Sequence, residues 1–359
     1  MKIIQIIQRK QLRGAEIFAC QLANHLVQIG HQVIVVSLFE NESSSLPFNG
    51  DIVCINAKPT LRYVDVSGWK KLARLITDFN ADIVQANAGD TLKYAVFSKL
   101  VFAWNAKLVF RNASTISQYL KNGFIKGLNG FLLARVDKII SVSNHSYKDL
   151  VRLYPALDSR CVVIPVGIEI GEQEADHSFE VLPRLGYLLH VGGFTFEKNH
   201  AGLLKIFKTV LETNSNLELW LVGDGPLGNK ITDMATEMGL SKHVRFLGFR
   251  SDIPQLMRGA RMLLLPSILE GLPGVILEAQ YFRVPVIAFD IGGVSEVIKN
   301  NETGWLIKAG DDIMFTNAIN EVLCSGMVDT IREKAYRQVI GQFKNSDIAR
   351  RFQQAYVSI

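Results

Sequence analysis

Short apolar segments rich in β-branched residues alternate along the chain with segments whose apolar residues recur every three to four positions. This alternation is typical of a parallel sheet whose strands are joined by crossover helices. The run Val33–Val36 carries no polar residue, which predicts a strand buried on both faces. The first series of strands is expected at residues 2–8, 32–38, 51–56, 82–86, 107–110, 138–142 and 161–165.

A second series follows a polar stretch from Ile168 to Leu182 that has no apolar period and therefore predicts a linker. Its strands are expected at residues 187–191, 217–222, 243–246, 262–265, 284–288 and 305–307. Helices of the first series are expected at residues 15–29, 68–78, 91–104 and 144–153.

The pattern predicts an α/β protein with two doubly wound, Rossmann-like parallel-sheet domains. The expected boundaries are 1–168 for the N-terminal domain, 169–182 for the linker, 183–342 for the C-terminal domain and 343–359 for a final helical segment. Ser346 is expected to cap that last helix, with Ile348, Phe352 and Tyr356 on one apolar stripe that must cover a surface. Because ligands of such sheets bind outside the carboxyl ends of the strands, we expect the chemistry there.

Length and composition support this interpretation. A chain of 359 residues exceeds what one hydrophobic core usually organises. With 48% hydrophobic and 20% charged residues, it is neither disordered, nor collagen, nor a coiled coil. Its four cysteines are too far apart for a zinc ribbon or a disulfide scaffold. No apolar run reaches the roughly 18 residues of a membrane span, and the first residues lack a signal-peptide core. We therefore expect a cytoplasmic protein in a reducing compartment.

The net charge of +5 is concentrated in the first half of the chain. Residues 1–160 carry roughly 20 Lys and Arg against 11 Asp and Glu. No run of adjacent basic residues and no zinc-finger or RNP-type motif accompanies this charge, so no nucleic-acid partner is expected. An anionic lipid surface is the other interpretation.

Residues 119–133 mix lysines with large apolar residues. An aromatic cluster with one lysine precedes them: Phe97, Lys99, Phe102 and Trp104. Together these residues would enter an anionic leaflet, which predicts a peripheral location at the inner face of the membrane. The alternative is that Phe124, Leu128 and Phe131 belong to the core, because helical spacing explains them equally well.

The most informative stretch runs from Pro266 to Ala279. It follows a strand, turns on two glycines and enters a helix whose first turn carries Pro273, where a missing N–H is harmless. The free amides at such a helix start, together with its partial positive charge, form a site for a phosphate. The residues of this turn are Gly271, Leu272, Pro273 and Gly274.

Two glutamates flank the turn. Glu278 lies in an apolar half-helix with no Lys or Arg within four positions, a costly place for a carboxylate unless hydrogen-bond donors such as the hydroxyls of a ribose reach it. Glu270 precedes the helix, where it can hold a sugar beside the phosphate. The competing interpretations are that Glu278 accepts from a loop amide or points to solvent, and that Glu270 is a surface acid.

Glycine turns follow three further strands. Gly192 and Gly193 come after the first strand of the second series, and Lys198 then offers a mobile cation for a diphosphate. A lone lysine is more often a solvated surface residue. The other two turns contain Gly223, Asp224, Gly225 and Pro226, and Gly248, Phe249 and Arg250. We expect these turns and the Glu270 segment to converge on one crevice, a combination more specific than any member.

This set of motifs resembles glycosyltransferase family four, retaining enzymes that use nucleotide sugars and have the GT-B fold of two Rossmann-like domains facing a cleft. Glu270 and Glu278, with seven residues between them, match the paired-glutamate signature of that family. The remaining matches are 192–199, 223–226, 266–267, 278–279, 285–287, 292–293, the glycine loop 13–16 and the junction 166–168. The resemblance thus covers essentially the whole chain.

The resemblance implies that Glu278 binds the donor ribose, that Glu270 binds the donor sugar and that Lys198 contacts the diphosphate, so Glu270 and Lys198 are the candidate catalytic residues. The donor-binding candidates are Gly14, Gly192, Gly193, Lys198, Gly223, Phe249, Arg250, Glu270, Gly271, Leu272, Pro273, Gly274 and Glu278. A UDP- or GDP-type sugar is expected as donor, without a metal or another cofactor. The final helix would cross back onto the N-terminal domain.

Two departures from the family pattern affect these assignments. The family commonly has Arg where Gly193 stands, so Arg13 or Arg250 would have to replace that cation. A histidine that the family often has near the reacting sugar is absent, because the strand end reads Val109–Ser114. The acceptor-side candidates are therefore Arg13, Asn87, Arg111 and Asn112.

The expected reaction is transfer of the sugar, with retention, to a hydroxyl of a glycan or lipid-linked acceptor in cell-surface polysaccharide or glycolipid synthesis. The helix start and Lys198 would stabilise the departing diphosphate, which could itself take the proton of the attacking hydroxyl. A nucleotide- or sugar-binding protein without activity remains an alternative, as does a phosphorylase or epimerase of the same fold. An NAD-dependent oxidoreductase is disfavoured because Gln8–Gly14 does not read G-x-G-x-x-G.

Overall fold

A computed structural model describes the chain from residue 1 to 359 except for residues 41–45, 62, 121, 171–185 and 325–327. The chain divides into two compact units. Unit 1 contains Met1–Glu169 and Lys344–Ile359, and unit 2 contains Ile170–Phe343. Most of the expected linker, residues 171–182, lies outside the described residues.

Unit 1 is built on a sheet of seven parallel strands in the order β3-β2-β1-β4-β5-β6-β7. Strands β1 and β4 are buried along almost their whole length, although each carries a buried glutamine. In β2, whose run Val33–Val36 predicted burial on both faces, Val35 and Val36 are buried and Val33 and Ile34 are half-buried. The strands are β1 (Lys2–Ile7), β2 (Gln32–Ser37), β3 (Ile52–Cys54), β4 (Ile83–Ala86), β5 (Lys107–Asn112), β6 (Lys138–Ser141) and β7 (Cys161–Val163).

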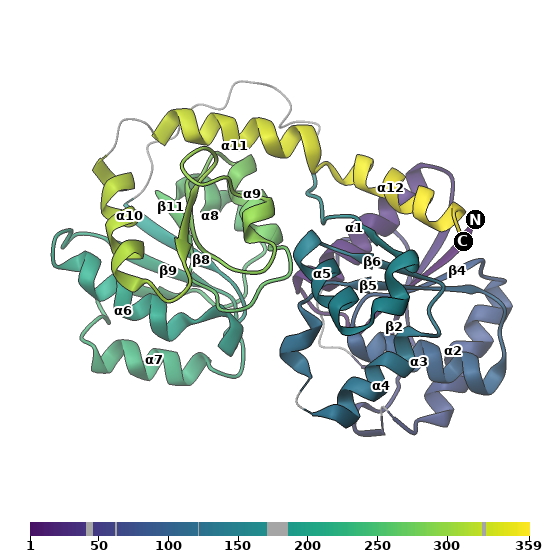
Figure 1. The fold of residues 1–359 in the computed structure, drawn as a ribbon. Helices are drawn as coiled ribbons and strands as arrows, with labels where there is room; N and C mark the ends of the chain where they lie inside the picture. The colour runs from purple at the N-terminus through teal and green to yellow at the C-terminus, as the bar shows by residue number, and fades with distance from the viewer. Residues whose placement is uncertain (41–45, 62, 121, 171–185, 325–327) are drawn as a thin grey trace. The chain divides into compact units, whose positions relative to one another are not determined.

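Helices cover both faces of this sheet (Figure 1). One face carries α1 (Gly14–Gln28) and α12 (Asn345–Val357), which pack together. The other face carries α2 (Val66–Phe79), α3 (Gly89–Phe102), α4 (Gly123–Leu133) and α5 (Asn144–Leu153), whose apolar residues form the larger core of this unit. The strand order reverses between β1 and β4, so the turns after these two strands diverge at the sheet edge.

The last helix belongs to unit 1, as the resemblance implied. Its stripe of Ile348, Phe352 and Tyr356 is buried. The expected cap is wrong, however, because α12 begins one residue before Ser346 and makes no side-chain cap. The start of α12 is instead decided by a tertiary contact, since the N–H of Asn345 donates to the carbonyl of Ile168 at 3.1 Å.

Unit 2 is built on six parallel strands in the order β10-β9-β8-β11-β12-β13. The strands are β8 (Tyr187–Val191), β9 (Glu218–Val222), β10 (Val244–Phe246), β11 (Met262–Leu265), β12 (Val286–Asp290) and β13 (Trp305–Lys308). One face carries α6 (His200–Leu211), α7 (Gly228–Glu237) and α10 (Asp312–Cys324), and the other carries α8 (Ile253–Gly259), α9 (Gly274–Tyr281) and α11 (Val328–Gln342) (Figure 1). Both units are therefore doubly wound α/β domains, as predicted.

Two element boundaries in unit 2 differ from expectation for local reasons. Strand β12 begins two residues later than the apolar run suggested, because the N–H of Val284 still bonds to the carbonyl of Ala279 at the end of α9. Arg283 has a left-handed backbone with φ 53° that makes this turn. Pro273 is the N-cap of α9 rather than part of its first turn. Among the described residues, none of the helices has the length and apolar character needed to cross a bilayer.

Candidate functional site

The sheet of unit 2 has its topological switch point between β8 and β11. From β8 the chain continues to β9 on one side, whereas β11 pairs with β8 on the other side, with Leu188 opposite Met262. The turns after β8 and β11 therefore diverge at the carboxyl edge, where open α/β sheets bind ligands. These are the turns that carry Gly192 to Lys198 and Pro266 to Gly274.

Backbone hydrogen bonds join the turns of this edge into one continuous surface. Each bond joins the loop after one strand to a neighbouring loop or strand end, so the glycine turns converge as the sequence predicted. The bonds are Gly192 N to Val222 O, Phe194 N to Asp224 O, Gly223 N to Gly248 O, Ile268 N to Glu197 O and Gly293 N to Gly271 O, all between 2.8 and 3.0 Å.

Two glycines are required by these close approaches. Gly223 has φ 132°, and a Cβ there would collide with the carbonyl of Gly192. Gly292 has φ 55°, and a Cβ there would collide with the carbonyl of Glu270. Both positions lie in backbone regions that residues with side chains rarely adopt. The backbone of Glu270 is therefore held against the turn after β12.

The candidate catalytic residues Lys198 and Glu270 form an ion pair with each other. The ammonium Nζ of Lys198 lies 2.5 Å from Oε1 of Glu270. The side chain of Lys198 is 22% exposed and that of Glu270 is 9% exposed, so the pair is mostly removed from water. The sequence placed both residues at this edge but did not predict their contact. The sequence did hold one signal for this contact, since the two residues have opposite charges and follow neighbouring strands.

The backbone around Lys198 is fixed by its neighbour. Asn199 has a left-handed backbone with φ 54°, accepts from the N–H of Gly202 and donates through Nδ2 to the carbonyl of Pro266 at 3.0 Å. This residue thus ties the start of α6 to the turn after β11. The carbons of the Lys198 side chain pass over Gly192, where a Cβ would lie 3.2 Å from Cδ. The missing side chain at Gly192 leaves room for Lys198.

Glu278 lies on α9 with its side chain half-buried. Within the described part of the chain, no hydrogen bond to its carboxylate is found. Burial alone raises the pKa of Glu278. A carboxylate that is desolvated and has no donor is costly, so this position favours a ligand that brings hydroxyl donors.

The amino end of α9 offers donors beside these carboxylates. Its N-cap is Pro273, which makes no side-chain cap. Gly274 and Val275 are only half-buried, and the first amides of a helix have no partner within it. The helix start therefore presents N–H groups and a partial positive charge to an anion.

Two buried histidines beneath the site were missed by the sequence analysis. His190 is wholly buried and donates through Nδ1 to the carbonyl of Leu264 at 2.8 Å. The ring of His200 lies 4.7 Å from that of His190 and stacks on Phe194 at 4.1 Å. Burial lowers the pKa of His190 to about 4 and that of His200 to about 2, with smaller contributions from Lys198. Both rings are therefore neutral near pH 7.

Two further donor-binding candidates, Phe249 and Arg250, follow strand β10 at the same edge. Phe249 is 56% exposed, and its ring is available for stacking. Arg250 is held by Asp252, with its Nε and Nη2 at 2.7 and 2.6 Å from the two carboxylate oxygens. Both side chains of this ion pair are exposed to solvent. At Gly193 a Cβ would make only ordinary contacts, at 3.4 Å or more.

Most acceptor-side candidates of unit 1 are interior residues. Asn87 is buried, donates to Gln5 and accepts from Gln85. Asn112 is fully buried and donates through Nδ2 to Ser141 Oγ at 3.3 Å. Contact with an acceptor would require these side chains to leave their partners.

Arg111 is also buried, and its guanidinium carbon lies 4.3 Å from the ring centre of Phe18. Its Nε and Nη1 find no hydrogen-bond partner among the described residues. Burial lowers the pKa of Arg111 to about 10, a loss that the carboxylate of Glu16 partly offsets. In contrast, Arg13 and Gly14 are exposed at the amino end of α1.

The apolar segment 119–133 is divided between core and surface. Phe124 on α4 is 79% exposed and Phe131 is also exposed, whereas Leu128 packs against the core. The core interpretation is therefore wrong for Phe124. Trp104 is buried, and Lys99 beside it donates to the carbonyl of Ala106. The preceding aromatic cluster is thus mainly structural.

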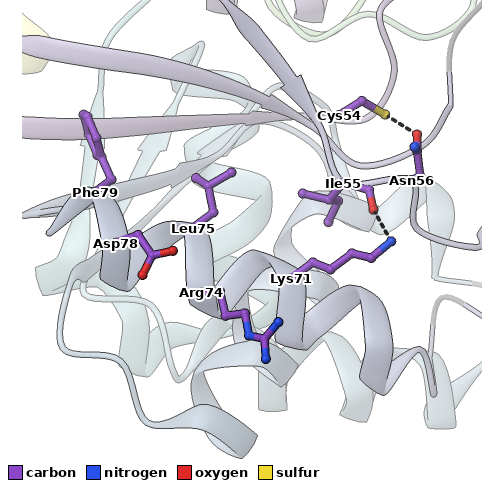
Figure 2. Close-up of a pocket in the computed structure, with 8 residues that line it drawn as sticks. All are labelled: Cys54, Ile55, Asn56, Lys71, Arg74, Leu75, Asp78 and Phe79. Carbon is purple, nitrogen blue, oxygen red and sulfur yellow. Dashed lines mark hydrogen bonds between the residues drawn. The ribbon is translucent and has the colours of Figure 1, made fainter.

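A hollow of about 630 Å³ lies elsewhere in unit 1, between β3 and α2 (Figure 2). Lys71 crosses it to donate to the carbonyl of Ile55 at 3.0 Å, and Cys54 donates to Asn56 Oδ1 at 2.9 Å. These groups are already paired within the protein. The hollow contains neither a glycine turn nor a pair of carboxylates, so the switch point of unit 2 is the stronger candidate site.

Comparison with known families gives two matches that together cover nearly the whole chain. Residues 12–172 match the family described as Glycosyltransferase Family 4. Residues 173–338 match the family described as Glycosyl transferases group 1. The residues of the candidate site in unit 2 all fall within the second match.

Individual relatives agree with these matches. The UDP-Gal:alpha-D-GlcNAc-diphosphoundecaprenol alpha-1,3-galactosyltransferase of Escherichia coli is 31% identical over 43% of this chain and 40% of its own length. The N-acetyl-alpha-D-glucosaminyl L-malate synthase of Bacillus anthracis is 28% identical over 48% of this chain and 45% of its own length. The chain thus matches less than half the length of these two relatives.

A solved structure shows the same fold. The crystal structure of Anabaena HepE in complex with UDP and glucose superposes with a TM-score of 0.84 over 100% of both chains, at 20% sequence identity.

Proposed function

The chain belongs to glycosyltransferase family four, and from that premise we propose that it transfers a sugar, with retention, from a UDP- or GDP-type nucleotide sugar to a hydroxyl of a glycan or lipid-linked acceptor. The observation that carries the proposal is the carboxyl edge at the switch point of unit 2. There Lys198 and Glu270 form an ion pair in the turns before α6 and α9, and the carboxylate of Glu278 on α9 has no donor among the described residues.

Each part of the donor binds the group at this edge whose chemistry suits it. The hydroxyls of the ribose donate to Glu278, which relieves the cost of burying that carboxylate. The diphosphate lies against the amides at the start of α9 and beside Lys198. Glu270 accepts from the hydroxyls of the sugar, and the exposed ring of Phe249 stacks on the base.

Transfer requires the bond between the anomeric carbon and the phosphate oxygen to break. Negative charge then grows on the diphosphate, and fixed donors aimed at that charge lower the barrier. The amides of α9 and the ammonium of Lys198 supply these donors. The acceptor hydroxyl attacks from the leaving-group face and gives its proton to the departing phosphate oxygen, so configuration is retained without a separate base.

Ligand binding and turnover of two variants test the donor site. Glu278→Ala should weaken binding of UDP or GDP by at least about tenfold, because it removes the acceptor for the ribose. Glu270→Ala should abolish turnover while nucleoside diphosphate binding is kept. Thermal shifts with a panel of nucleoside diphosphates and nucleotide sugars identify the ligand first, since binding to the native state raises the melting temperature. Small and equal effects of both substitutions would contradict the site.

The acceptor is proposed to be lipid-linked and to be reached at an anionic membrane surface through unit 1. In support, Phe124 and Lys126 are both exposed on α4, and the relative from Escherichia coli is named for a diphosphoundecaprenol acceptor. An exposed aromatic ring near lysines is the composition that enters the headgroup region of an anionic leaflet.

Sedimentation with vesicles containing phosphatidylglycerol tests the membrane part separately. The protein should pellet with the vesicles at low salt, and Phe124→Ser should release most of it. The matched control is Ile313→Ser, which removes an equally exposed apolar side chain on α10 of unit 2 and should change nothing. Recovery of the unaltered protein only in the supernatant would exclude this surface as the docking site.

A further inference from the structure

The proposed function assigns Lys198 to the diphosphate and Glu270 to the sugar, yet in the structure these two residues bond to each other. We propose that this ion pair is an exchangeable latch. The donor diphosphate takes the ammonium of Lys198 away from Glu270, and only then is the Glu270 carboxylate free to accept from the sugar hydroxyls. This inference rests on the proposed function and concerns the regulation of the same site.

The backbone on both sides of the latch is held in place, so the exchange involves side chains alone. The carbonyl of Glu270 lies against Gly292, and the carbonyl of Gly271 accepts from the N–H of Gly293 at 2.8 Å. On the other side, Asn199 ties the residues after Lys198 to Pro266. Lysine has four rotatable side-chain bonds, which let its ammonium move while its backbone stays fixed.

The donor diphosphate and Glu270 compete for Lys198 because few cationic side chains lie at this edge. In the turns after β8, β9, β10 and β11 and in residues 291–293 after β12, the described residues include two cationic side chains, Lys198 and Arg250. Arg250 is bonded to both oxygens of Asp252. Gly193 contributes no side chain. A diphosphate that reaches these turns must therefore share or take the ammonium that neutralises Glu270.

The cost of releasing Glu270 depends on what replaces the ammonium. The Glu270 side chain is 9% exposed, so water cannot fully solvate it once the pair opens. A buried carboxylate left without a partner is strongly unfavourable. The sugar of an intact donor supplies hydroxyl donors to it, whereas a nucleoside diphosphate supplies none there. The latch therefore favours the intact donor over the spent nucleotide.

This preference gives the latch a role in turnover. After the sugar has left, Glu270 is again without donors while the diphosphate still holds Lys198. Re-formation of the Lys198–Glu270 pair satisfies the carboxylate and weakens the hold on the nucleotide. The ion pair thus helps to expel the nucleoside diphosphate product.

Titration calorimetry on the whole protein tests this idea with UDP, UDP-glucose, GDP and GDP-mannose as probes. Glu270→Gln keeps the shape of the side chain but removes the charge that competes for Lys198. We expect this variant to bind the preferred nucleoside diphosphate about tenfold more tightly than the unaltered protein, which corresponds to about 1.4 kcal/mol. The nucleotide sugar should not gain to the same extent, so the preference for the intact donor should disappear.

The matched control is Glu278→Gln, which removes a carboxylate at the same edge that does not contact Lys198. It should weaken the nucleoside diphosphate and the nucleotide sugar by similar factors. Lys198→Met should weaken both ligands as well, since it removes the shared cation. Circular dichroism melting checks that each variant is folded at the temperature of the titration.

Each result decides a different claim. An unchanged or weaker affinity of folded Glu270→Gln for the nucleoside diphosphate would overturn the latch while leaving the proposed function intact. Failure of the unaltered protein to bind any of the four probes would count against the proposed donor class itself. A selective gain for the nucleoside diphosphate in Glu270→Gln would support both.

Discussion

The two units contain sheets of the same kind, yet their switch-point edges use polar residues in opposite ways. In unit 2, Glu270, Lys198 and Glu278 remain partly accessible. In unit 1, Asn87 next to the switch point and Asn112 at the end of β5 are buried and bonded to other side chains. Two sheets with the same strand topology can therefore differ in how accessible their polar side chains are to a ligand.

The last helix explains much of the difference. Tyr356 of α12 donates to Gln85 at 2.7 Å and accepts from Gln5, and both glutamines bond to Asn87. This network fixes α12 on unit 1 and satisfies the polar groups of β1 and β4 internally. Unit 2 instead leaves donors and carboxylates for a ligand, while its loops are held by backbone hydrogen bonds. Polar residues at a strand end thus indicate a site only where they stay accessible, as Lys198 and Glu270 do although they bond to each other.

The largest effect on stability is expected from adding a side chain at Gly223, which lies against the carbonyl of Gly192 in unit 2. Gly223→Ala places a Cβ against the carbonyl of Gly192 at φ 132°, so it should lower the free energy of unfolding by about 3 kcal/mol or more. Donor binding should fall with it. Gly14→Ala is the control in unit 1, because no atom lies within 4 Å of its Cβ and it opens a helix. Chemical denaturation of both variants measures the difference, and equal stabilities would contradict it.

Acidification should weaken unit 2 through the histidines beneath the site. Burial lowers the pKa of His190 from 6.5 to about 4. Between these two values His190 is protonated in the unfolded chain and neutral in the folded chain. The free energy of unfolding should therefore fall by about 2 kcal/mol from pH 7 to pH 5 through His190 alone. His31 in unit 1 adds to the same trend, since burial lowers its pKa as well.

Thermal unfolding of His190→Gln at both pH values isolates the contribution of this histidine. The loss of stability between pH 7 and pH 5 should be smaller in the variant than in the unaltered protein. An identical loss in the two proteins would show that His190 is not kept neutral by its surroundings.

A smaller effect, confined to unit 1, is expected from Tyr356→Phe. The change removes a buried hydroxyl and leaves Gln85 and Gln5 without this partner, at a cost of about 1.5 kcal/mol. Because the network has no member in unit 2, the affinity for nucleoside diphosphates should stay the same. Denaturation and titration calorimetry together check this, and a large loss of nucleotide affinity would contradict the separation of roles.

The smallest effect is a gain in affinity for nucleoside diphosphates, from a substitution at the carboxyl edge of the sheet in unit 2. Gly193→Arg introduces the cation that the family commonly has at this position, and the backbone tolerates a Cβ there because it would lie 3.4 Å from the nearest atom. The added charge should tighten nucleoside diphosphate binding about fivefold, or by about 1 kcal/mol. Gly193→Gln is the uncharged control and should give no gain. A fall in affinity for Gly193→Arg would show that the turn excludes a second cation.

By itself the sequence determined the class of fold, the two sheets and the turns that converge after β8, β9, β10 and β11. These features follow from apolar periodicity and from glycines at strand ends, which are local properties. The isolation of Glu278 from neighbouring cations was also visible in the sequence. The roles given to Glu270, Glu278 and Lys198 came from resemblance to a family, and they stay predictions.

Only the tertiary structure decided which polar residues have partners. The Lys198–Glu270 pair joins residues 72 positions apart, and the bond between Tyr356 and Gln85 joins residues 271 positions apart. The burial of His190, Asn112 and Arg111 depends equally on helices that pack from distant parts of the chain. Hydrogen bonding and desolvation act through space, so no local pattern of residues records them.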